Sequence, residues 1–237
     1  DSLNGGDGAD VLYGVSGDDI LRGQAGADAL AGGTGADLGL GGAGDDRLWG
    51  AAGADRLFGQ AGRDVLQGGA QGDRLFGGGQ GDLLFGQAGA DTGQGGTGAD
   101  RLFGGAGPDL LAGNAQNDAL FGQLGDDVLW GQRGNDVING NAGDDRMGGG
   151  PGADRFVFDG ADWGQDTIVG FDGRPASQDR ILIARDSGEA QSAAAFRDAL
   201  SEVPGGLLYD LGGDGRNTIF LPGVSPAEIG AAEVAIF

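Results

Sequence analysis

Aspartate recurs at every ninth position of this chain, without a slip, from residue 1 to residue 154. Carboxylates can serve as acids and bases in catalysis, or as oxygen ligands for hard cations. Five residues before each aspartate from the second onward stands a glycine, and two residues after nearly all of them stands an apolar residue. These repeat aspartates are Asp1, Asp10, Asp19, Asp28, Asp37, Asp46, Asp55, Asp64, Asp73, Asp82, Asp91, Asp100, Asp109, Asp118, Asp127, Asp136, Asp145 and Asp154.

The repeating unit is G-G-x-G-x-D-x-U-x, where U is apolar, and seventeen complete units run from residue 5 to residue 157. Its glycine-rich half predicts a turn, because glycine tolerates positive φ, and its D-x-U-x half predicts a short strand with U on one face. One such strand cannot bury a core alone, so two units are expected to form a coil that stacks on the next. The expected fold is all-β: a parallel β-roll of about eight coils around a thin leucine core.

Stacked coils would place aspartates two units apart, such as Asp10 and Asp28, in two ladders with rungs about 5 Å apart. Such rows of carboxylates repel one another, so a cation between rungs would stabilise the fold. Calcium suits the site because it takes roughly six to eight oxygen ligands, including backbone carbonyls of the kind that glycine-rich turns supply. Magnesium prefers a tighter octahedron, and transition metals prefer the His and Cys that this chain lacks. We therefore predict that every repeat aspartate is a ligand for one of several Ca²⁺ ions.

Composition excludes several functions. The formal net charge of −22, with 14 basic residues that are all Arg, disfavours binding to nucleic acid or anionic membranes. No Cys is present to form a disulfide, and no apolar run reaches the length of a membrane span. Without His or Cys the chain cannot build a zinc-protease site, a Ser–His–Asp triad or a Cys–His pair. Carboxylates that hold calcium stay ionised, the wrong state for a general acid, so we expect no catalytic residue and no enzyme activity.

The in-phase aspartates and the glycine-rich unit resemble the RTX, or hemolysin-type, calcium-binding nonapeptide repeats over about two thirds of the chain. The resemblance implies a parallel β-roll over residues 1–157 that folds on calcium binding outside the cell. It also implies export from a Gram-negative bacterium by the type I secretion machinery. Residues 1–4 read as the end of another unit, so we expect the chain to be a piece of a larger exoprotein.

After residue 157 the nine-residue period stops and the composition becomes ordinary. Helices are expected at 192–203 and from Ser225 onward, where Ser would cap a first turn that contains Pro. Residues 158–237, called the flank below, are thus expected to form a β-rich capping subdomain with one or two short helices. Apolar stretches predict its strands, at residues 156–158, 167–169, 180–183, 207–209 and 218–221.

The flank also resembles the segment that closes the β-roll in serralysin-like proteases and related exoproteins. The resemblance rests on residues 164–172, on residues 179–183 and on the acid-then-apolar ending at 233–237. It implies an uncleaved type I export signal within the last several dozen residues. The flank's aspartates are candidates for a further ion site, although a surface role is favoured for them: Asp166, Asp172 and Asp179.

Two smaller patterns leave alternatives open. The aspartates directly before a repeat aspartate are either extra calcium ligands or solvent-facing turn residues: Asp18, Asp45, Asp126 and Asp144. The residue after U is aromatic in eight units, and three of these aromatics, 18 residues apart, predict an outward stacked ladder: Phe85, Phe103 and Phe121. Such a ladder either stiffens the sheet or forms a surface for a partner or for self-association.

Three functions follow from these patterns. The leading one is a calcium-driven folding and secretion module. The alternatives are an adhesin or surface-layer module whose calcium-rigidified rod is the binding surface, and a roll with a ligand-binding face.

Overall fold

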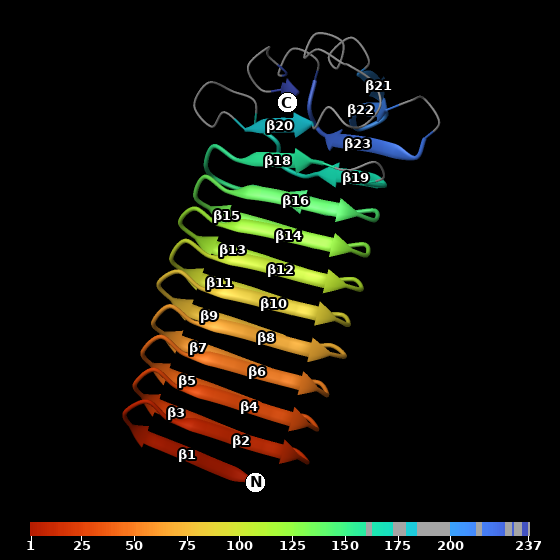
Figure 1. Cartoon of the computed structure of the whole chain (residues 1–237). Coiled ribbons are helices and arrows are strands. Elements are labelled where there is room, and N and C mark those ends of the chain that lie inside the picture. The colour runs from red at the N-terminus through yellow and green to blue at the C-terminus, as the bar shows by residue number, and fades with distance from the viewer. Residues whose placement is uncertain are drawn as a thin grey trace.

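The computed structural model describes residues 1–159, 163–172, 179–183, 200–211, 215–225, 229 and 234–236. Every regular element in this described part is a β-strand, and the strands form two sheets, one of 13 and one of 11 strands. From β1 to β20 successive strands alternate between the sheets, and each strand pairs in parallel with the strand two places along the chain, from β1 with β3 to β18 with β20. The chain therefore winds as a solenoid, with the N-terminus at one end and the flank strands at the other (Figure 1). This confirms the predicted parallel β-roll.

The roll strands are regular in length. Those from β1 to β16 have six residues each, and β17 and β18 are shorter. Their bounds are β1 Ser2–Asp7, β2 Val11–Ser16, β3 Ile20–Ala25, β4 Ala29–Thr34, β5 Leu38–Ala43, β6 Arg47–Ala52, β7 Arg56–Ala61, β8 Val65–Ala70, β9 Arg74–Gly79, β10 Leu83–Ala88, β11 Thr92–Thr97, β12 Arg101–Ala106, β13 Leu110–Ala115, β14 Ala119–Leu124, β15 Val128–Arg133, β16 Val137–Ala142, β17 Arg146–Gly148 and β18 Arg155–Phe158.

The pairing register aligns each repeat position with itself one coil further on. In β10 and β12, for example, Leu84 pairs with Leu102, 18 residues later. Between the sheets nearly every strand buries a single apolar side chain at U, and these residues are at most 2% exposed from Leu21 to Phe156. Where U is Gly39, the Cδ2 atom of Leu57 lies 3.0 Å from the point that a Cβ would occupy, so neighbouring leucines fill the gap. The core is the thin leucine layer that the sequence predicts.

The strands begin later and run further than the D-x-U-x half of the unit predicts. Each strand from β1 to β16 begins just after its aspartate and continues through the first three residues of the next unit, leaving a turn of only three residues, as at 35–37. The second residue of the unit keeps a positive φ even where it is not glycine, for example 79° at Gln60 and 80° at Val15. Parallel pairing of these positions with the neighbouring coil, such as Gly33 with Ala51, offsets a conformational cost of about 1–2 kcal/mol per residue.

The flank strands continue the roll and then depart from it. Strands β19 and β20 pair in parallel with β17 and β18, while β21, β22 and β23 form an antiparallel meander at the end of the larger sheet. All five strands predicted around and within the flank are present. They are β18, β19, β20, β22 and β23, while β21 and β24 were not predicted. The bounds of the flank strands are β19 Gln165–Ile168, β20 Arg180–Ile183, β21 Ser201–Val203, β22 Gly206–Leu211, β23 Asn217–Pro222 and β24 Val234–Ile236.

The helix expected at 192–203 is wrong in its last three residues, which form β21 in a hairpin with β22. The apolar spacing that suggested a helix there is satisfied instead by cross-strand pairing, as between Val203 and Gly206. Leu200, the residue before β21, is not helical either, and the rest of that expected helix, residues 192–199, lies outside the described residues. Residues 226–228, at the start of the helix expected after Ser225, also lie outside the described residues.

The predicted aromatic ladder is confirmed on the outer face of the smaller sheet. The ring centroids of Phe85 and Phe103 lie 5.1 Å apart, those of Phe103 and Phe121 lie 4.9 Å apart, and both pairs are stacked. A second stacked pair, Phe58 and Phe76 with centroids 4.6 Å apart, occupies the larger sheet. Rings at this spacing stabilise neighbouring coils against sliding or separating.

Replacing Phe85, Phe103 and Phe121 together with Ser is expected to destabilise the calcium-loaded roll by about 1–3 kcal/mol, because two stacked pairs are lost. Urea denaturation of the calcium-loaded chain measures the loss, and sedimentation velocity measures association. Unchanged stability with altered association would instead identify the ladder as an interaction surface.

Candidate metal centre

Each repeat aspartate stands at the end of a turn, directly before a strand, so one ladder of aspartates runs along each turn edge of the roll. The first ladder precedes the odd-numbered strands, from Asp1 to Asp145, and the second precedes the even-numbered strands, from Asp10 to Asp154. The repeat aspartates from Asp19 to Asp154 are at most 3% exposed. Asp10 is partly exposed and Asp1 is exposed, because no coil precedes them in the structure.

One carboxylate oxygen, Oδ1, joins neighbouring rungs. The backbone N–H of Asp82 donates to Oδ1 of Asp100 at 2.7 Å, and the N–H of Asp100 donates to Oδ1 of Asp118 at 2.8 Å. At the start of the first ladder the backbone nitrogen of Asp1 takes the same place beside Oδ1 of Asp19. The ladders predicted from the 18-residue spacing are therefore present, and their rungs are hydrogen-bonded to one another.

The other oxygen, Oδ2, is buried without a hydrogen-bond donor in the described part of the chain. This holds for all seventeen repeat aspartates from Asp10 to Asp154. A buried acceptor left unpaired costs about 1–3 kcal/mol, and a charged one costs more. A row of such atoms requires a positive partner, either a proton or a metal ion.

The surroundings of Oδ2 fit calcium. A Cβ added to Gly14 would lie 2.5 Å from Oδ2 of Asp19 and 2.6 Å from the carbonyl oxygen of Gly32 in the next coil, so two oxygens of different kinds converge there. Among the described residues no three acidic side chains converge on one point, so backbone carbonyls would have to complete each coordination shell. An all-oxygen donor set of carboxylates and carbonyls is the type that calcium prefers.

Burial raises the pKa of these carboxyl groups. The pKa rises to about 7 for Asp82 and Asp127, and to about 6 for Asp64, because desolvation disfavours the charged form. Hydrogen bonds from the backbone of the preceding rung act in the opposite direction and are outweighed. Neighbouring carboxylates of the ladder raise the pKa of Asp82 and Asp127 further.

Acid is expected to replace calcium in part. In the unfolded chain each carboxyl group returns to a pKa of about 3.9. Because the folded pKa is the higher one, the protons stabilise the fold fully below about pH 4, and this stabilisation is lost as the pH rises through about 6 to 7. With calcium chelated, the far-ultraviolet circular dichroism should show more β-structure at pH 4.5 than at pH 7.5. Equal spectra, with light scattering excluding aggregation, would contradict this linkage.

Gly95, the first residue of its unit, provides a test of the space beside Oδ2. Its backbone is not in the left-handed region, so alanine brings no backbone strain, but a Cβ there would contact Oδ2 of Asp100 and lie 2.7 Å from its Cγ. Gly95→Ala is therefore expected to weaken calcium-dependent folding at that turn by about 1–3 kcal/mol, measured as a higher calcium midpoint.

The matched control for this substitution is Gly93→Ala in the same strand. A Cβ at Gly93 points into the core, where its nearest neighbour is Cδ2 of Leu111 at 3.0 Å. This change is expected to leave the calcium midpoint close to that of the parent chain, because leucine methyl groups can shift to accommodate it. Equal effects of the two substitutions would contradict the assignment of the space beside Gly95 to the metal site.

The aspartates that precede a repeat aspartate are exposed and link neighbouring turns. Oδ1 of Asp18 accepts the N–H of Ala36 at 2.8 Å, and Asp45 accepts both the N–H of Arg63 and its guanidinium group. Those bonds to Arg63 lower the pKa of Asp45. Their positions match the interpretation of solvent-facing turn residues.

The surface role favoured for Asp166 and Asp179 is wrong. Asp166 and Asp179 are 2% and 1% exposed. Oδ1 of Asp166 accepts the N–H of Asp145, and Oδ1 of Asp179 accepts the N–H of Asp154, so each adds a rung to one ladder. The sequence conceals this role because the spacing changes to 21 and 25 residues, although an Asp before or within a β-stretch is the same local signal.

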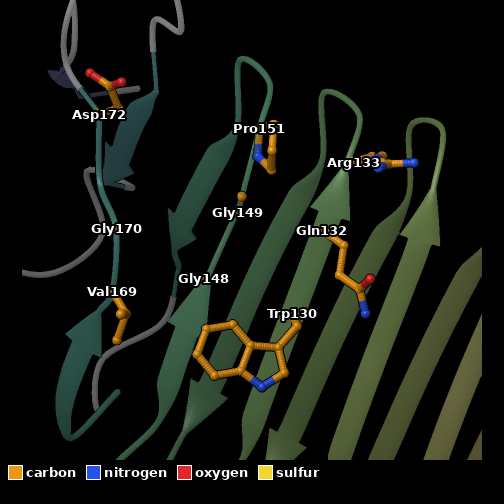
Figure 2. Close-up of a pocket in the computed structure, with 10 residues that line it drawn as sticks. Trp130, Gln132, Arg133, Gly148, Gly149, Pro151, Val169, Gly170 and Asp172 are labelled. Atoms are coloured by element: carbon orange, nitrogen blue, oxygen red, sulfur yellow. The ribbon is translucent and has the colours of Figure 1, made fainter.

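A hollow that the sequence does not predict lies where the last coil meets the flank. It has a volume of about 690 Å³ and is lined by Trp130, Gln132 and Arg133 on one side and by Gly148, Pro151 and Asp172 on the other (Figure 2). The indole ring lies against Gly148, where a Cβ would meet its ring carbons. Glycine after U, beside an aromatic residue 18 positions earlier, is the sequence signal for such a hollow.

The fold and the turns define a repeat protein of the parallel β-roll class with carboxylate-lined edges. The family model of the RTX calcium-binding nonapeptide repeat (four copies) matches residues 4–39, 32–66, 58–93, 94–129 and 121–156. The chain belongs to this RTX calcium-binding repeat family. In the described residues no helix is long and apolar enough to cross a membrane.

Two solved structures are similar to this chain. A subunit of the mannuronan C5-epimerase of Azotobacter vinelandii is 29% identical, with a TM-score of 0.41, over 55% of this chain and 78% of that one. The extracellular lipase of Serratia marcescens is 17% identical, with a TM-score of 0.43, over 92% of this chain and 45% of the lipase. Among curated proteins no sequence matches this chain.

Proposed function

We propose that this chain is a calcium-binding module that folds outside the cell and supports type I secretion of a larger exoprotein. The observation that carries the proposal is the row of seventeen buried Oδ2 atoms without hydrogen-bond donors in the described residues. Calcium ions between rungs would be held by the repeat aspartates and by carbonyl oxygens of the glycine-rich turns. The ions would supply positive charge; the chain would supply ordered oxygens and a water-excluding leucine layer.

Membership of the RTX repeat family supports calcium as the ion. Calcium-dependent folding also supports the export role. A chain that folds only on calcium binding stays unfolded where calcium is scarce, and an unfolded chain can pass through an exporter. Folding in a calcium-rich medium would then prevent the exported segment from moving back into the exporter. We also propose that the chain itself is not an enzyme, because it has no His or Cys and its buried carboxylates would be engaged by calcium.

Secretion is tested by fusing a reporter to the N-terminus of the chain in a Gram-negative host that carries a type I exporter. Reporter is expected in the medium only when the exporter is present and the flank is intact, and it should be protease-resistant only when the medium contains calcium. A variant without residues 158–237 is the matched control. Equal export without the exporter or without the flank would contradict the secretion role.

An adhesin or surface-layer role is the second candidate, favoured by the hollow beside Trp130. An aromatic ring flanked by an amide, a guanidinium group and a carboxylate is a typical lining for a binding site. Binding of the calcium-loaded chain to immobilised polysaccharides and matrix proteins tests it, with Trp130→Ala expected to lose binding and Phe76→Ala, on the same sheet, to keep it. Absence of any binding by the parent chain would contradict this role.

A further inference from the structure

The second aspartate ladder ends in a rung that differs from the rungs before it. At an interior rung such as Asp100, Oδ1 accepts the N–H of Asp82, and Oδ2 is buried without a donor in the described residues. At Asp179 both oxygens accept hydrogen bonds. Oδ1 takes the N–H of Asp154 at 3.0 Å and Oδ2 takes the N–H of Asp172 at 2.8 Å.

The backbone around Asp179 copies an ordinary coil, although the spacing from Asp154 is 25 residues instead of 18. The N–H of Arg180 donates to the carbonyl oxygen of Asp154 at 2.7 Å, as the N–H of Arg155 donates to that of Asp136 at 2.8 Å. Strand β20 then pairs with β18 in parallel register. Two hydrogen bonds differ from those of an interior rung: Oδ2 accepts a peptide N–H, and the N–H of Asp179 donates to a backbone carbonyl and not to another aspartate.

That N–H comes from within the flank. Asp179 and Asp172 are joined in both directions, because the N–H of Asp179 also donates to the carbonyl oxygen of Asp172 at 3.2 Å. Asp179 is 1% exposed, so its carboxylate depends on these donors and not on water. The two backbone N–H donors give each oxygen of this buried carboxyl group a partner, although desolvation still raises its pKa.

We propose that Asp179 is the terminating rung of the second ladder, a positioning residue that fixes the last coil to the flank without a calcium ion. The inference rests on the proposed function, in which interior Oδ2 atoms bind calcium. At Asp179 a calcium ion would compete with the N–H of Asp172 for Oδ2, whereas Oδ2 of Asp100 has no donor in the described residues. The first ladder ends differently, because only Oδ1 of Asp166 accepts a hydrogen bond within the described residues, from Asp145 at 2.9 Å.

The test compares Asp179→Asn with Asp100→Asn, an interior rung of the same ladder. Bound calcium per chain is measured by atomic emission at saturating calcium, and the calcium midpoint of folding by circular dichroism. Asp179→Asn is expected to keep the parent's number of ions and to raise the midpoint by about two- to tenfold, because a charge-assisted hydrogen bond becomes a donor–donor contact. Asp100→Asn is expected to lose at least one ion.

A fall in ion number for Asp179→Asn equal to that for Asp100→Asn would overturn the inference. If Asp100→Asn keeps the full number of ions, the proposed function itself fails. Hydrogen exchange on the calcium-saturated parent chain decides the matter even if Asp179→Asn does not fold. The amide of Asp172 should be strongly protected, whereas rapid exchange at that amide would show that Oδ2 of Asp179 has another partner.

Discussion

In excess chelator at neutral pH the chain is expected to lose most of its β-structure, and calcium at about 0.1 to 1 mM to restore it. The reason lies in the balance between core and ladders. Nearly every roll strand buries only one apolar side chain, while each turn buries a carboxylate whose Oδ2 has no donor in the described residues. When the unfolded chain has no binding site, the free energy of calcium binding becomes free energy of folding.

Circular dichroism across a calcium titration measures the folding, and calorimetry measures the binding. Magnesium at the same concentrations is the control, and it is expected to restore little structure because it prefers a small octahedron and its own waters. A β-roll that persists in excess chelator at neutral pH would contradict calcium-coupled folding.

A chain that ends at residue 157 is expected to stay mostly disordered even at millimolar calcium. A first coil is costly to form, because both of its turns must become ordered before stacking can stabilise them. The flank lowers that cost by extending both sheets, through β19 on β17 and β20 on β18. It also contributes a larger core, with Trp163, Ile181 and Leu207 at most 1% exposed.

The matched control removes one coil from the other end, residues 1–18, and is expected to fold at nearly the same calcium midpoint as the full chain. The flank supplied as a separate polypeptide should restore folding of the truncated array. If the array ending at residue 157 folds at the same calcium concentration as the full chain, the flank does not nucleate the roll.

The nine-residue period determined most of the fold by itself. Because every unit carries glycine and aspartate at fixed positions, every coil has the same solution to its local geometry, and parallel stacking aligns each position with its copy, as Leu84 with Leu102. The same argument predicted the aspartate ladders and the stacking of Phe85 on Phe103. The periodic sequence is enough to predict these contacts, because the same contact recurs between each coil and the next.

Where the period stops, apolar stretches still predicted five strands, but only the tertiary structure decided how the segments pair. Asp166 and Asp179 extend the ladders at spacings of 21 and 25 residues, and this change of spacing hides a D-x-U pattern that they share with the repeat aspartates. Residues 201–203 form a strand because β22 offers them an edge, against the helical spacing of their apolar neighbours. In the roll, pairing with adjacent coils also determined at which residues the strands begin and end. These features depend on which segments meet in space, and local residue preferences are too weak to specify that.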